Sequence, residues 1–302
     1  MRLDLPQSTE GNTQMRKLFV AVAMTAVMLA SASSAAAASH SPTGEFSNFG
    51  ECPLNRPTLE FCIYSESNGG FFQLGSKTVP LKNPVILQGG LEFDVGAPTF
   101  FGAENGVTLS KAAQPVPGGL LGIEAPLWWP KFLRDLFNET INNGSTGVTA
   151  TVEVAGPATS IVVNPLNLFT GQGTAISLPV KIKLSNPFLG SNCYIGSNSK
   201  PVVIDFITGE TSPPPPNTPI KGALGTVTPN PTGSMLTISG GKLVNNSFAA
   251  PGATGCGGLF SFLVDPFVNS ITGLPSPAGT NTAILEGKLQ DAFAAAVKAS
   301  EP

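Results

Sequence analysis

The chain has 302 residues with a formal net charge of −3, and only 12% of them are charged, about half of the usual share. Apolar residues make up 41% of the sequence, which is enough for a core, and the content of glycine and proline stays below the level typical of disordered chains. The sequence has neither a basic stripe nor an array of aromatic and basic residues, which argues against nucleic-acid binding.

The N-terminal part of the chain has the features of a secretory signal peptide. A short basic stretch precedes the apolar run 18–30, and an Ala/Ser-rich segment follows it. The apolar run is too short to span a bilayer, so we interpret residues 1–38 as an export signal, with Met15 as an alternative initiator. Cleavage after Ala37 and after Ala38 fit the small-residue rule equally well. No later segment has the length of a transmembrane span, and we expect a secreted, extracellular protein.

All four cysteines follow the predicted signal: Cys52, Cys62, Cys193 and Cys256. An even number of cysteines in an exported chain predicts two disulfides, for which three connectivities exist. We favour Cys52–Cys62, which closes a short loop, and Cys193–Cys256, which ties the ends of a segment rich in proline and glycine. No CxxC pair is present, and the sequence predicts neither a metal site nor a cofactor.

Strict alternation of apolar and polar residues predicts half-buried antiparallel strands. It is clearest at 148–154 and 180–185. Further candidate strands between Gly- and Asn-rich turns are 59–65, 85–95, 107–111, 159–163, 202–208 and 236–244. Many short strands of this kind are typical of all-β folds. We expect a mainly β protein, an antiparallel β-sandwich or barrel-like sandwich, held by disulfides and carrying one or two short packed helices.

Two segments have helical periodicity. Residues 130–141 begin with a proline, which the first helical turn tolerates, and residues 282–298 place apolar side chains at helical spacing. We expect both helices to pack on the sheet. The Pro-rich stretch 211–231 indicates a boundary or a long loop. The mature chain then has a β-rich domain, 39–210, followed by the Pro-rich loop, the Cys-bridged β segment and the C-terminal helix within 211–302, as part of the same fold.

His40 is the only histidine in the sequence, and it lies close to the predicted cleavage site. Catalysis by Ser-His-Asp or Cys-His groups, and zinc bound by histidine, need an imidazole that the fold holds in place. We expect residue 40 to lie in a flexible tail that cannot do this. The sequence therefore predicts a non-enzymatic protein of the cell envelope or the medium, with a binding or structural role.

Carboxylate chemistry does not need a histidine. Glu92 and Asp94 stand two residues apart, which places both carboxylates on one face of a strand, where they can act as acid and nucleophile on a glycoside. A solvated strand face is the simpler interpretation. The alternative function is therefore a carbohydrate-active enzyme or a carbohydrate-binding module.

Trp128 and Trp129 precede the helix expected at 130–141. Paired indoles can stack on sugars or hold a helix at a lipid surface, whereas the simpler interpretation is that they fasten the helix to the core. Cell-wall glycan and an apolar ligand are therefore both candidate partners. Binding of an apolar ligand or a lipid requires a cavity or an exposed patch near Trp128.

Three phrases in the last part of the chain resemble uncharacterised secreted proteins of high-GC Gram-positive bacteria. They are SNCYIGS at 191–197, LVNNSFAAP at 243–251 and GCG at 255–257. The resemblance implies export and a unit held by Cys193 and Cys256. It brings no catalytic residue with it.

Overall fold

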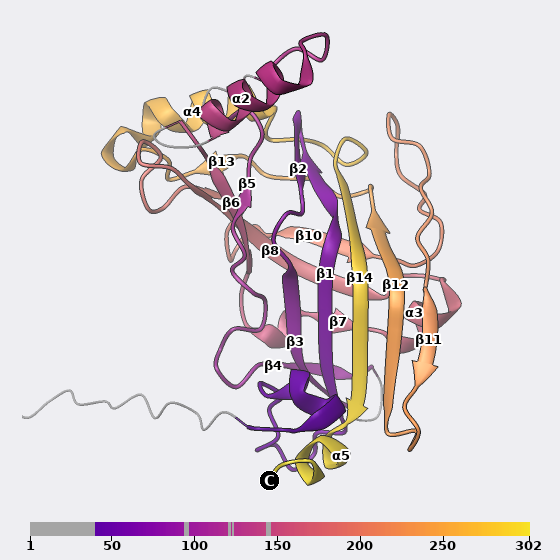
Figure 1. The fold of residues 1–302 in the computed structure, drawn as a ribbon. Coiled ribbons are helices and arrows are strands. Elements are labelled where there is room, and N and C mark those ends of the chain that lie inside the picture. Colours follow the sequence, from indigo (N-terminus) through magenta and orange to yellow (C-terminus); the bar gives the residue numbers. More distant parts are fainter. Residues whose placement is uncertain (1–39, 94–96, 120–121, 123, 143–145) are drawn as a thin grey trace, which may run out of the picture. The chain divides into compact units, whose positions relative to one another are not determined.

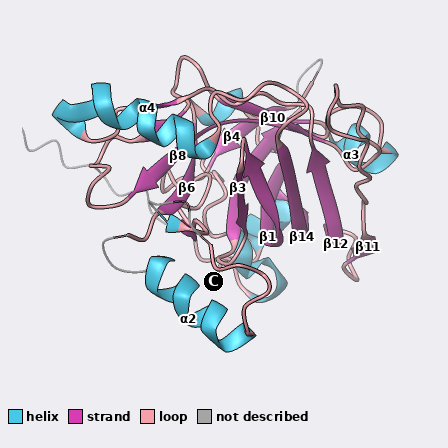
Figure 2. Ribbon diagram, turned by 90° about the horizontal axis from the view of Figure 1, so that it is seen from above, coloured by secondary structure: helices cyan, strands magenta, loops and turns pink. Residues whose placement is uncertain are grey.

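The computed structural model describes residues 40–93, 97–119, 122, 124–142 and 146–302. The expected export signal lies outside the described residues. The described chain forms two antiparallel sheets that pack face to face around one large hydrophobic core (Figures 1 and 2). The fold is mainly β, as the alternating sequence pattern predicts.

The first sheet, sheet A, has the strand order β11-β12-β14-β1-β3-β4, and β2 pairs with β1 beside this path. All of these pairings are antiparallel. The strands are β1 (Phe61–Leu74), β2 (Lys77–Pro80), β3 (Val85–Glu92), β4 (Thr99–Gly102), β11 (Thr226–Pro229), β12 (Met235–Asn245) and β14 (Thr282–Phe293). The first and the last long strand of the described chain are therefore neighbours in the middle of this sheet.

The second sheet, sheet B, is organised around its longest strand, β8 (Ile176–Ser185), which pairs with four others. The remaining strands are β5 (Gln114–Pro115), β6 (Thr149–Val154), β7 (Val162–Val163), β9 (Tyr194–Ile195), β10 (Val202–Phe206) and β13 (Ala253–Thr254). A bridge between Ile207 and Val244 joins the end of β10 to β12 of sheet A. The sandwich is thus linked across one edge, as in a barrel-like sandwich.

The helices described are more numerous than the one or two expected. They are η1 (Gly44–Phe49), α2 (Lys131–Asn142), η3 (Ala158–Ser160), α3 (Pro165–Thr170), η4 (Gly258–Phe260), α4 (Ser261–Thr272) and α5 (Ala294–Ala299). The helix predicted at 130–141 is confirmed as α2. Figure 1 shows α2 and α4 at one end of the sandwich and α5 at the other.

The helix predicted over 282–298 is wrong for most of its length. Residues Thr282–Phe293 form β14, which pairs with β1 on one side and β12 on the other, and only Ala294–Ala299 are helical. Apolar residues recur here at helical spacing, but long-range pairing outweighs this local pattern. Gly287 lets the strands approach closely, since a Cβ atom there would lie 2.0 Å from the backbone oxygen of Glu66.

Most of the other predicted strands are present with shifted ends. The two clearest patterns correspond to β6 and to the second half of β8, and their apolar residues face the core. The segment 107–111 is not a strand and contributes a single bridge at Leu109, while 159–163 begins as η3. The stretch 211–231 is more than a loop, because it contains β11 of sheet A.

Both disulfides form with the favoured pairing, Cys52–Cys62 and Cys193–Cys256. The first lies in a second hydrophobic cluster, in which residues of η1 and α5 pack against Cys62, Met235 and Ala292 of sheet A. Two disulfides are typical of proteins that fold in an oxidising compartment outside the cytoplasm. Within the described ranges, no helix has the length and apolar character needed to cross a membrane.

Removal of each disulfide should lower the stability by a different amount. The bridges close loops with sequence separations of 10 and 63 residues, and the entropy model gives about 3 kcal/mol for the short loop and about 4 kcal/mol for the long one. We expect C193S/C256S to lose more unfolding free energy in urea than C52S/C62S. Equal losses, or the reverse order, would contradict a dominant role of loop closure.

Asp291 is a buried carboxyl group in the middle of sheet A. It lies on β14 between Ile63 of β1 and Leu236 of β12, and its Oδ1 atom is buried without a hydrogen-bond partner. Burial raises the pKa of this carboxyl from 3.8 to about 6, because a charge in apolar surroundings loses its hydration. The group is thus ionised at neutral pH at a cost to the folded state.

Replacement of Asp291 by Asn should stabilise the protein at neutral pH and not in acid. The folded state binds the proton more tightly than the unfolded chain, so the wild-type unfolding free energy falls as the pH rises from about 4 to above 6. We expect D291N to gain about 1–3 kcal/mol at pH near 7.5 and almost nothing near pH 4. Urea unfolding at both pH values measures this, and a gain independent of pH would contradict the raised pKa.

Candidate functional site

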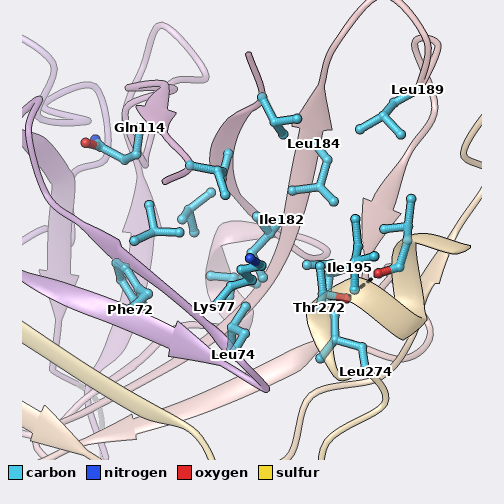
Figure 3. A pocket seen from close by; sticks show the side chains of 18 of the residues that line it. Phe72, Leu74, Lys77, Gln114, Ile182, Leu184, Leu189, Ile195, Thr272 and Leu274 are labelled. Atoms are coloured by element: carbon cyan, nitrogen blue, oxygen red, sulfur yellow. Dashed lines mark hydrogen bonds between the residues drawn. The ribbon is translucent and has the colours of Figure 1, made fainter. Parts of the chain in front are cut away.

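A cavity of about 80 Å³ lies between the two sheets, where α4 borders the sandwich. Figure 3 shows its lining side chains converging from both sheets and from α4. The wall consists almost entirely of apolar side chains: Phe72, Leu74, Val79, Val116, Val148, Ala150, Val152, Val180, Ile182, Leu184, Leu189, Ile195, Ile204, Val268, Ile271 and Leu274. A dry apolar cavity can bind an apolar ligand.

The cavity follows from the same alternation that predicts the strands. The inward residues of β6 and β8 are short or β-branched, with Ala150, Val152, Val180 and Ile182 among them. They do not fill the space that faces the β1–β2 hairpin. An unfilled volume of this size costs on the order of 2 kcal/mol in lost contacts. A core packed for stability alone would contain larger side chains at these positions.

Two smaller cavities continue the space between the sheets. The second, of about 30 Å³, shares Phe72 and Val152 with the first. The third, of about 40 Å³, shares Ser65, Ile176 and Leu285 with the second. We call the three together the inter-sheet cavity row. Protein interiors contain few voids of this size, so three neighbouring ones that share lining residues are a distinctive feature of this core.

Three polar side chains line the first cavity, and each of them makes a hydrogen bond to the backbone. The Gln114 side chain accepts from the backbone N–H groups of Lys82 and Asn83 and donates to the Asn83 carbonyl. The Thr272 hydroxyl donates to the Val268 carbonyl. The third, Lys77, donates to the carbonyl oxygen of Gly122 at 3.2 Å. Its ammonium group has three N–H donors.

Two polar side chains of helix α4, Asp265 and Asn269, are turned toward the protein. The Asp265 carboxylate accepts from the backbone N–H groups of Gly255 and Cys256, and the Asn269 side chain bonds both the N–H and the carbonyl of Ala253. Val268 and Ile271 line the cavity. Both the disulfide at Cys256 and these hydrogen bonds therefore fasten one side of α4 to sheet B.

The outer side of α4 and of the short helix before it is apolar and exposed. Leu259 is 93% exposed and Phe262 is 70% exposed. We call the five residues of this surface the α4 apolar face: Leu259, Phe260, Phe262, Leu263 and Phe267. A surface helix normally directs polar side chains toward solvent, and an exposed apolar patch marks a contact with a partner, a ligand or a membrane.

The two tryptophans do not fasten α2 to the core as the simpler interpretation predicts. Trp128 is 82% exposed, while half-buried Trp129 packs edge-on against Phe137 of α2 with 5.6 Å between the ring centroids. The expectation that α2 packs on the sheet with its apolar side is also wrong, since Leu133 and Leu136 are exposed. The patch required for lipid binding is therefore present at Trp128.

The carboxylate pair is described only in part. Glu92 ends β3, and its Oε2 atom lies 3.1 Å from Nη2 of Arg56, whose guanidinium group stacks on the ring of Phe101. Asp94 lies outside the described residues. Glu92 is thus held in an ion pair. It lies at one end of β3, whereas Val85 at the other end lines the second cavity.

His40 is not a free tail residue, and this expectation is wrong. Its Nε2 atom lies 3.2 Å from Oε2 of Glu104, and its Nδ1 atom lies 2.7 Å from Oε1 of Glu301. The imidazole therefore joins the start of the described chain to its C-terminal end. Both ring nitrogens face carboxylates, so neither is directed at a position where it could take a proton from a nucleophile.

Sequence reasoning missed two elements of this site. Lys77 follows a Gly-Ser turn, where a lysine is expected in solvent, and no local pattern shows that it lines a cavity. The segment of α4 contains Pro266, and a proline argues against a helix interior in the sequence. The sequence does offer one signal for an exposed apolar face. Four large apolar residues, interrupted by one serine, stand at 259–263 (LFSFL), directly after a glycine-rich cysteine motif.

Comparison of the chain with protein-family models, with curated proteins and with solved structures finds no match.

Proposed function

We propose that this chain is an exported, non-enzymatic binding protein that takes an apolar ligand into the inter-sheet cavity row. The observation that carries this proposal is the first cavity, whose wall is apolar apart from Lys77, Gln114 and Thr272. Binding sites for apolar molecules are concave and largely preformed, with few polar groups. A ligand there would recover the dispersion contacts that the empty cavity lacks.

The α4 apolar face supports a lipid surface as the place where the ligand is taken up or delivered. The inner side of α4 lines the cavity, and its outer side exposes phenylalanine and leucine side chains. Side chains that protrude as far as Leu259 need a complementary hollow in a protein partner, whereas acyl chains can rearrange around them. Insertion into the boundary between head groups and acyl chains is the known behaviour of such faces.

The carbohydrate-binding alternative has weaker support. Exposed Trp128 is the feature that favours it, but the rings of Trp128 and Trp129 are inclined at 84° to one another. Two perpendicular rings do not form one flat platform for a sugar chain. An exposed indole beside exposed Leu127 and Phe132 is better suited to the interface between water and lipid.

Filling the cavity should abolish binding of a neutral apolar probe. Val152 lines both the first and the second cavity, so V152F places a ring in the space that the ligand needs. We expect decanol to bind the mature wild-type protein and not V152F, as measured by isothermal titration calorimetry. The matched control is V203F on β10, because Val203 faces solvent and the same substitution there leaves the cavity open.

Thermal unfolding of both variants shows whether each is folded. Loss of decanol binding in folded V152F with retention in V203F supports the cavity as the site. Absence of binding to the wild-type protein, or equal binding to wild type and folded V152F, overturns the proposed function.

Polar substitutions on the α4 apolar face should weaken binding to lipid vesicles. Phe262 and Leu263 are exposed neighbours on α4, and Leu166 and Phe169 are exposed residues of the same types on α3, which lies across the molecule in both views. We expect F262S/L263S to lower partitioning onto phosphatidylcholine vesicles by roughly 10-fold or more. L166S/F169S is the control and should sediment with vesicles as the wild type does; equal losses would contradict a specific face.

A further inference from the structure

Lys77 introduces a cation into the wall of an otherwise apolar cavity. It is the first residue of β2, and its backbone pairs with Leu74 across the turn. The half-buried side chain lines the first cavity, and Figure 3 shows it among Phe72, Leu74 and Ile182. Its position is set by the β1–β2 hairpin, which sheet A holds in place.

The ammonium group of Lys77 is the polar group of this cavity that retains capacity for a ligand. One donor is used by the Gly122 carbonyl, and no carboxylate in the described part of the chain forms an ion pair with it. By contrast, Lys242 and Lys288 at the third cavity are paired with Glu286 and Glu66. The charge at Lys77 is thus uncompensated within the described site.

An uncompensated cation beside an apolar wall loses hydration and gains little in return. An anionic group placed next to it restores the balance through a charge-assisted hydrogen bond. A ligand suited to this site has an anionic group at one end and an apolar body at the other. Lys77 would contact the anionic group of such a ligand, and the apolar wall of the same cavity would contact its apolar body.

We infer that the ligand is a single-chain amphiphile with an anionic head group, and that Lys77 binds the head while the inter-sheet cavity row takes the tail. This inference rests on the proposed function. The cavities are narrow and follow one another, with Phe72 and Val152 between the first and the second. The cavities measure about 80, 30 and 40 Å³, so a single acyl chain is the shape that suits the row, and a ten-carbon tail enters it only when lining side chains such as Phe72 and Val152 move apart. A fatty-acid carboxylate and the phosphate of a single-chain lipid provide the same head-group chemistry.

Calorimetric titration of three probes with the same tail separates the contributions of head and tail. The probes are decanoate, decyl phosphate and decanol, and the proteins are the mature wild type, K77M and K77R. We expect K77M to weaken the binding of decanoate or decyl phosphate by roughly 10- to 100-fold, since a hydrogen bond to a charged group contributes about 1.5–3 kcal/mol. K77M should leave decanol unchanged, and K77R should retain most of the binding of the anions.

The matched control is K82M, because Lys82 is an exposed lysine of the next turn and its removal changes the net charge by the same amount. The role of Lys77 is overturned if K82M and K77M weaken binding equally. It is also overturned if the wild type and K77M bind decanoate, decyl phosphate and decanol equally well. Either result leaves the proposed function standing. Failure of all three probes to bind the wild type overturns both. The anion that binds more tightly identifies the head group.

Discussion

The pairing of β1 with β14 is the contact on which the rest of the structure depends. It joins the first and last long strands of the described chain over twelve residue pairs, from Phe61 with Phe293 to Gln73 with Thr282. The strands come so close at Gly70 and Gly287 that a Cβ atom there would lie 2.0 Å from a backbone oxygen of the partner strand. A contact so distant in sequence has a large loop-closure entropy to overcome, and it also brings His40 within reach of the C-terminal Glu301.

This pairing also determines where the candidate site lies. The far end of β1 turns into β2, which places Lys77 and Val79 at the wall of the first cavity. Sheet B provides the opposite wall, and the Cys193–Cys256 bridge fastens the segment before α4 to β9. The cavity is therefore bordered by elements that are each fixed independently, by strand pairing on one side and by a disulfide on the other.

The local pattern of the sequence predicts the strands and helices that local periodicity determines. It fails where contacts between segments distant in sequence determine the structure. Strict alternation identifies β6 and β8, because residues such as Ile182 and Leu184 are buried on one face only. β14 was predicted as a helix because Leu285 and Leu289 fit both periodicities, and only the neighbouring strands select between them. The disulfides follow from cysteine number and spacing. A cavity between two sheets depends on how strands distant in sequence face one another, which the alternation within one strand does not show, and so the local pattern predicts neither the cavity row nor Lys77.

Three features of the α4 end do not serve the stability of the fold. A cavity lacks contacts, the half-buried ammonium group of Lys77 has no carboxylate partner among the described residues, and the α4 apolar face exposes phenylalanine and leucine to water. Single substitutions such as V152F for the cavity and K77M for the charge would remove the first two of them. Features that disagree with an otherwise consistent fold are expected at functional sites. The anionic amphiphile that we propose would fill the cavity with its tail and pair its head group with Lys77, and the lipid surface that supplies it would cover the α4 apolar face.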